Sequence, residues 1–171
     1  MSFTTYDASV PALRQMLKSV LHFLNKLEAH AAEKGVDAST LLTAKLAPDM
    51  FDFTRQIQIA CDHAKGAVGR LAGVDLPKHE DTEKTVAELR ARVQATLDFV
   101  LSVKAEQFAD AEDKAIKVVY PWATYDFTGR TYLMNYALPN FYFHVTTAYD
   151  ILRHSGVVIG KTDFLTGRSA A

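Results

Sequence analysis

Apolar residues recur every three or four positions in four long stretches of the chain, the pattern of amphipathic helices. The first stretch runs from Val10 to Leu27. Ser9 and Pro11 are start signals for this helix, because serine caps free backbone N–H groups and proline is tolerated in the first turn of a helix. Gly35 is a stop signal, and a short helical turn is expected at residues 39–45.

A second helix is predicted after Pro48 and Asp49, from Met50 to Leu71. Its apolar residues again follow a helical period, and Gly73 lies just beyond its end. Residues 74–81 include a proline and a polar cluster, so they are predicted to form the link to the next helix.

The third helix is marked by apolar positions from Val86 to Leu101. Thr82 and Thr85 precede it and are both candidate caps. The pattern fades after that, so the helix is expected to end between Val103 and Asp110.

The stretch from Ala115 to Asn135 has no sustained helical period and is rich in β-branched and aromatic residues. It is predicted to form a short hairpin or an irregular excursion. The fourth helix is expected to begin near Pro139 and to end at Gly156. The tail to Ala171 is expected to be irregular.

Four helices that are each apolar on one side must bury those sides against one another. The predicted fold is therefore all-α, a four-helix bundle with the excursion lying over one end. At 171 residues and 49% hydrophobic composition, residues 1–171 are expected to form one domain with a sizeable core.

Charge and composition narrow the classes of partner. Nineteen basic and twenty acidic residues give a formal net charge of -1, and no dense basic run is present, so nucleic acid is not expected as a partner. The first ten residues do not have the pattern of a signal peptide, and no apolar run approaches the roughly 18 residues of a membrane span. A cytoplasmic protein without membrane contact is expected, and the single cysteine, Cys61, excludes an internal disulfide.

Histidines provide the main candidate chemistry. His144 lies on the apolar face of the fourth helix, where its imidazole needs a partner inside the protein. That partner is either a buried hydrogen-bonding group, or a metal or substrate on which His144 acts as ligand or acid–base group. His63 lies on the flank of the second helix's apolar face, where it is either a partly exposed residue or a second member of the same site.

Other sequence signals indicate structure rather than catalysis. Cys61 and His63 lie about 200° apart around a helix, which argues against a catalytic dyad, and Cys61 is expected to be a buried thiol. The segment GVVIGKT, residues 156–162, has the wrong glycine spacing and follows a helix, so it is not expected to bind phosphate. No role is assigned to three other histidines: His22, His30 and His79.

Aromatic residues before the fourth helix have two interpretations, and two residues within that helix have an expected structural role. The aromatic residues of the excursion either line a pocket or hold the segment against the bundle: Tyr120, Trp122, Tyr125 and Phe127. Tyr149 and Arg153 share one side of the fourth helix and are expected to hold the tail by stacking or hydrogen bonding.

The segment PNFYFHVTTAYDILRHSGVVIGKTDFL resembles a bacterial family of unknown function that is similar to the DinB/YfiT-like helical bundles. The resemblance rests on a set of spaced residues: Pro139, Asn140, His144, Tyr149, Arg153, Gly156, Gly160, Lys161 and Asp163. It implies a four-helix bundle, and commonly a divalent metal such as zinc or nickel held by three histidines.

Carried onto this chain, the implied metal ligands are His63 on the second helix and His144 on the fourth. The third ligand is implied at position 148, where this chain has Ala148, which cannot bind a metal. His154 cannot replace it, because it lies about 15 Å along the helix from His144, against a zinc–nitrogen bond of about 2.1 Å.

Three functions are consistent with these features. The first is a small-molecule-binding or degenerate metalloprotein scaffold with a pocket near His63 and His144. The second is a metal-dependent hydrolase or a thiol-dependent transferase, in which a bound ion activates water. The third is a structural homodimer without catalytic activity.

Overall fold

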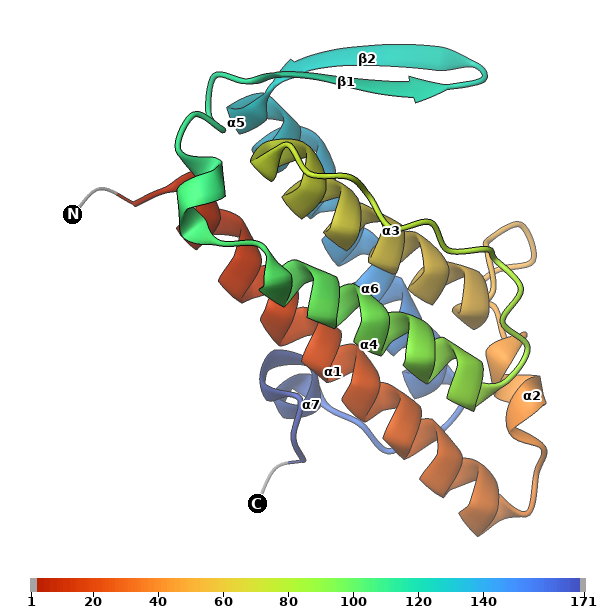
Figure 1. Ribbon diagram of the computed structural model, residues 1–171. Helices are drawn as coiled ribbons and strands as arrows, with labels where there is room; N and C mark the ends of the chain where they lie inside the picture. Colours follow the sequence, from red (N-terminus) through yellow and green to blue (C-terminus); the bar gives the residue numbers. More distant parts are fainter. Residues whose placement is uncertain (1–2, 170–171) are drawn as a thin grey trace.

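Four long helices lie side by side in the computed structural model, which describes residues 3–169 (Figure 1). They are α1 (Thr5–Lys34), α3 (Phe53–Ala72), α4 (Val86–Ser102) and α6 (Leu138–His154). Helix α3 packs on α4 and α6, and α1 packs on α4. Each helix buries most of its predicted stripe in a shared core that includes Leu17, Ile57, Leu89 and Ile151, whereas Leu101 is exposed. The predicted helical bundle is therefore confirmed for these four elements.

Helix α1 begins earlier than the sequence pattern predicted. Thr4 and Asp7 form a capping box, in which the Thr4 hydroxyl accepts from the Asp7 N–H at 3.2 Å and the Asp7 carboxylate accepts from the Thr4 N–H at 3.0 Å. Ser9 is buried inside the helix, so its prediction as a cap is wrong. Gly35 has φ 64° and ends the helix as predicted.

The next two long helices begin at side-chain caps. Asp52 accepts from the Arg55 N–H at 2.8 Å, so α3 begins slightly after the predicted Met50. Thr85 forms a capping box with Glu88 and confirms the predicted start of α4. The short α2 (Ala38–Leu42) lies where a helical turn was expected, and a 3₁₀ turn η1 (Ala105–Phe108) follows α4.

The excursion is a hairpin of β1 (Ala115–Tyr120) and β2 (Ala123–Thr128), paired antiparallel. The fold is thus mostly helical but not strictly all-α. Along β1, Ile116 and Val118 are buried against the bundle, because successive side chains of a strand point to opposite faces. An isolated hairpin is marginal in water, so packing over the bundle end stabilises it (Figure 1).

The last long helix, α6, begins at Leu138, next to the predicted Pro139, but helical turns that the sequence pattern did not predict precede it. A helical turn α5 (Gly129–Tyr132) continues through a π-helical turn η2 (Leu133–Ala137) directly into α6. Proline lacks an N–H and clashes with the preceding turn of an ordinary α-helix, and a wider turn relieves this conflict. The Asn140 side chain also donates to the Tyr136 carbonyl at 2.7 Å.

Part of the C-terminal segment forms a helix on α1 instead of being irregular, and residues 170–171 of the predicted tail lie outside the described residues. This helix is α7 (Lys161–Thr166), whose Phe164 ring meets the ring of Tyr149 edge-on at 5.6 Å, while Arg153 donates to the Ile159 carbonyl at 2.7 Å. These contacts confirm the predicted roles of Tyr149 and Arg153. His22, to which no role was assigned, pairs with Asp163 at 2.7 Å. Among the described residues, no helix has the length and apolar character needed to span a membrane.

Candidate functional site

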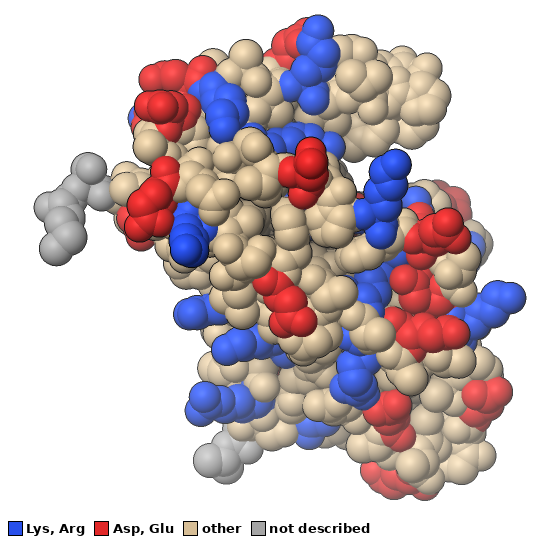
Figure 2. All heavy atoms as spheres, viewed as in Figure 1, with Lys and Arg blue, Asp and Glu red and all other residues tan. Residues whose placement is uncertain are grey.

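A cleft of about 830 Å³ lies beneath the hairpin, between the hairpin, α3 and the linker from α3 to α4. In Figure 2 the surface is hollowed at this place, and basic and acidic side chains are interspersed around it. Its lining includes one histidine, one arginine and three aromatic residues: His63, Arg70, Tyr120, Trp122 and Tyr136.

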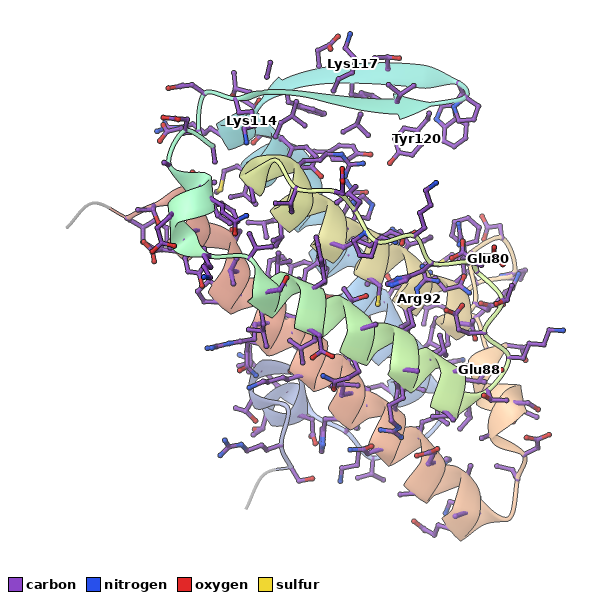
Figure 3. All side chains as sticks on the ribbon, in the orientation of Figure 1. Glu80, Glu88, Arg92, Lys114, Lys117 and Tyr120 are labelled. Atoms are coloured by element: carbon purple, nitrogen blue, oxygen red, sulfur yellow. The ribbon has the colours of Figure 1, made fainter. Side chains whose placement is uncertain are left out.

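Aromatic side chains form the hairpin side of the cleft. Tyr120 points from the hairpin toward the helices, whereas Lys117 lies on the outer face (Figure 3). The Tyr120 and Tyr136 hydroxyls share a hydrogen bond of 2.6 Å, and the Tyr120 ring stacks on Trp122 at 5.1 Å. Burial and the hydrogen bond from Tyr120 raise the pKa of Tyr136, so this phenol is neutral. These residues both hold the hairpin and line the cleft.

The fold brings the two predicted histidines together. The rings of His63 and His144 are nearly parallel, with centroids 5.9 Å apart, and His63 lines the cleft. The Gln56 side chain donates to the Phe51 carbonyl at 3.2 Å, which turns its oxygen toward His144. That oxygen lies 2.7 Å from His144 Nδ1, so Nδ1 is the donor and Nε2 keeps its lone pair.

Both imidazoles are neutral near pH 7. Burial lowers the pKa of His144 to about 4, and the positive charge of Arg55 acts in the same direction. Burial also lowers the pKa of His63 to about 4, reinforced by the neighbouring His144. The buried hydrogen-bonding interpretation of His144 is therefore supported by a specific partner, the Gln56 amide.

The residues around the two histidines do not fit the metal site that the resemblance implies. Ala148 is fully buried and offers no ligand atom. Asp62 lies next to His63 in sequence, but its carboxylate is held by Lys65 at 2.9 Å and by Arg92 at 3.0 Å. Within the described part of the chain, no group of three or more histidine, cysteine, aspartate or glutamate side chains is placed to hold an ion. A catalytic zinc normally needs three protein ligands.

The linker wall of the cleft is fixed by a buried arginine. The Arg92 side chain is only 2% exposed and its guanidinium lies between α3 and the linker, near Glu80 in Figure 3. It pairs with Asp81 at 2.9 Å, with Glu83 at 3.1 Å and with Asp62 at 3.0 Å. Although burial raises the pKa of Asp81, hydrogen bonds and charges from Arg55 and Arg92 hold it below its ordinary value.

Arg70 is a site residue that the sequence analysis missed. Its Nη1 donates to the Tyr132 hydroxyl at 3.1 Å, and its guanidinium lies over the Tyr132 ring at 5.8 Å. The available sequence signal was Gly66, four residues earlier on α3, which leaves room for this side chain. Cys61, in contrast, is buried as predicted, and burial raises its pKa to about 11.

Comparisons with known proteins identify the family of this chain and a similar solved structure. Residues 5–165 match the family described as a domain of unknown function, DUF1993. The crystal structure of a DinB family member protein from Shewanella denitrificans is similar, with a TM-score of 0.86 and 43% sequence identity, over 97% of this chain and 94% of that one. No curated protein matches the sequence.

Proposed function

The chain belongs to the DUF1993 family and is a DinB-like protein, and from this premise we propose that it binds a small organic molecule in the cleft beneath the hairpin. In this proposal the histidine pair is a remnant of a metal site that now contributes to a binding pocket. The observation that supports it most strongly is the cleft itself, which places aromatic rings and a few polar groups around one hollow.

The size and lining of the cleft suit a small ligand. Small-molecule sites usually have volumes of roughly 300–1,000 Å³ and apolar walls with a few placed polar groups. Here the walls include the rings of Tyr120, Trp122 and Tyr136, together with the aliphatic side chains of Ile59 and Leu76. A hydrogen bond joins Tyr120 to Tyr136 and the Tyr120 ring stacks on Trp122, which lowers the ordering cost of binding a ligand between these rings.

His63 supplies a neutral polar group to the same hollow. Because its pKa is lowered to about 4, it remains an uncharged hydrogen-bonding partner at physiological pH. The His144 ring lies against the His63 ring and is held by a hydrogen bond with Gln56. This arrangement supports the use of the two residues in binding without an ion.

The only tryptophan of the chain, Trp122, provides a direct test. Its side chain is 77% exposed and lines the cleft, so a ligand that covers it will shift and quench its emission. We expect a library of small organic compounds to contain members that both change Trp122 emission and raise Tm. Ile59→Phe, which fills the cleft, should abolish both effects, while Leu165→Ala on α7 should preserve them. A library without any such compound would contradict the proposal.

We also propose that the protein forms a homodimer through the exposed face of α6, and a separate observation supports this. Residues 131–149 contain no Asp, Glu, Lys or Arg, and α6 exposes Tyr142 and Phe143, with Phe143 57% exposed. Exposed apolar surface of this kind is typical of protein contacts. Sedimentation analysis should show a dimer that Phe143→Lys converts to a monomer, and a wild-type monomer at all concentrations would refute this role.

A further inference from the structure

We infer that the cleft selects organic monoanions, namely carboxylates attached to an apolar or aromatic body, and that Arg70 is the residue that binds the carboxylate. This inference rests on the proposed function and narrows it to a ligand class. It depends on the uncompensated charge of Arg70, on the space made for its guanidinium, and on the neutrality of its neighbours.

The charge of Arg70 has no acidic partner. Among the described residues, no carboxylate lies within 4.0 Å of its guanidinium, and its one side-chain hydrogen bond goes to the Tyr132 hydroxyl. Tyr132 itself is neutral, because burial raises its pKa. A guanidinium has five N–H donors in a planar fork, so most of its donors remain available to a ligand. A partly buried arginine with a neutral partner is suited to binding an anion.

Gly66 gives this guanidinium its place on α3. A Cβ atom at position 66 would lie 2.3 Å from Arg70 Nη1 and 3.5 Å from the Tyr132 hydroxyl oxygen. Glycine inside a helix costs about 1 kcal/mol relative to alanine, so the position carries a stability cost that the packing of Arg70 explains. The guanidinium thus lies between the backbone of α3 at Gly66 and the Tyr132 ring.

The other charged groups of the cleft are compensated or peripheral. Lys65 pairs with Asp62 at 2.9 Å, and Arg55 pairs with Asp81. Lys78 and Glu80 are both exposed at the linker and oppose each other in charge. One inward positive charge therefore remains, and it matches a ligand with a single negative charge.

The remaining walls favour a flat apolar body on that anion. Tyr120 and Trp122 form a stacked pair at the hairpin tip, and Tyr136 lies next to His63 with ring centroids 5.7 Å apart. Aromatic faces bind planar groups by offset or edge contacts. A carboxylate on a short aromatic body satisfies both the fork and these rings.

Phenylacetate and its uncharged amide, phenylacetamide, test this inference by isothermal titration calorimetry. The two compounds have nearly the same shape and differ in the negative charge that Arg70 is inferred to bind. A charge-assisted bond contributes about 1.5–3 kcal/mol, so we expect phenylacetate to bind roughly 10- to 150-fold more tightly. Arg70→Gln should remove this difference, and Gly66→Ala, which displaces the guanidinium but keeps its charge, should reduce it.

Arg14→Gln is the matched control, because Arg14 is exposed on α1 and does not line the cleft. It removes the same net charge and should leave both affinities unchanged, with circular dichroism confirming that all variants fold. Equal binding of the two probes to the wild type would overturn the charge selection and leave the binding cleft intact. Tighter binding of benzylphosphonate than of phenylacetate would overturn the carboxylate assignment. If neither probe binds and the compound library also gives no ligand, the proposed function itself fails.

Discussion

Replacing Arg92 by methionine tests how the linker wall of the cleft is held. Methionine keeps much of the aliphatic volume of arginine but removes the guanidinium from its three carboxylates. Two of these carboxylates retain another cation, since Asp62 keeps Lys65 and Asp81 keeps Arg55. Glu83 loses its ionic partner and keeps only the Gln58 side chain, at 2.8 Å.

The size of the effect follows from this difference. Breaking a buried ion pair by removing one partner costs about 3–5 kcal/mol. Because Asp62 and Asp81 are partly solvated and keep a second cation, we expect the lower end, about 3 kcal/mol. For a chain of this length that corresponds to a decrease in Tm of about 6–12 °C. The neighbouring Arg90→Met removes an exposed pair with Glu28 and should cost less than about 1 kcal/mol.

Thermal unfolding measures the loss of stability, and limited trypsin digestion measures how accessible the linker is. We expect cleavage after Lys78 and Lys84 to accelerate in Arg92→Met, because the linker is released from α3 and α4, and to remain slow in Arg90→Met. If both variants lose the same stability, or if the linker is cut at the wild-type rate in Arg92→Met, the guanidinium does not hold this wall.

Three other outcomes are expected. His63 and His144 have folded-state pKa values of about 4, below the ordinary 6.5, so the unfolded chain binds more protons between these two pH values. The unfolding free energy should therefore fall as the pH decreases from about 6.5 to about 4. Urea titrations in which His144→Gln keeps the full wild-type dependence of unfolding free energy on pH would contradict this. Ala148→His should bind zinc with a stoichiometry that the wild type does not reach, as measured by metal analysis of protein purified without an affinity tag, and equal metal content in both would refute the assignment of position 148. Gly129→Ala should lower the unfolding free energy, measured in urea, by more than about 2 kcal/mol, because its Cβ would lie 1.7 Å from a backbone carbonyl oxygen. Gly160→Ala should be tolerated, because the nearest atom to its Cβ lies at 3.8 Å. Similar losses in both variants would show that the backbone near Gly129 moves to accommodate a side chain.

Local signals in the sequence were sufficient for most helices and several of their ends. Thr85, Gly35 and Gly73 act as caps through contacts within their own turns, so residue type and spacing identify them. Pro139 marked the start of α6 correctly, because its place in the first helical turn is a local rule. The π-helical turn that leads into α6 was not predicted, since it depends on the packing of the residues on both sides.

The site depended more on contacts between distant parts of the chain. His63 and His144 could be paired in advance through the family resemblance, and the fold brings them together. Arg70 could not be identified as a site residue, because its environment is made by Tyr132, which lies 62 positions away. His22 and Asp163 are separated by 141 positions, and neither has a sequence signal that points to the other.

The π-helical turn at residues 133–137 also has an evolutionary consequence. One such turn holds an extra residue relative to an α-helix, and each residue rotates the chain by about 100°. Deleting a single residue there would turn Tyr132 and the hairpin side of the helix by about a quarter of a revolution, while His144 and the core side kept their register. Relatives that gain or lose this residue can thus change the cleft in one step without repacking the bundle, so we expect length variation in this family to fall at this turn.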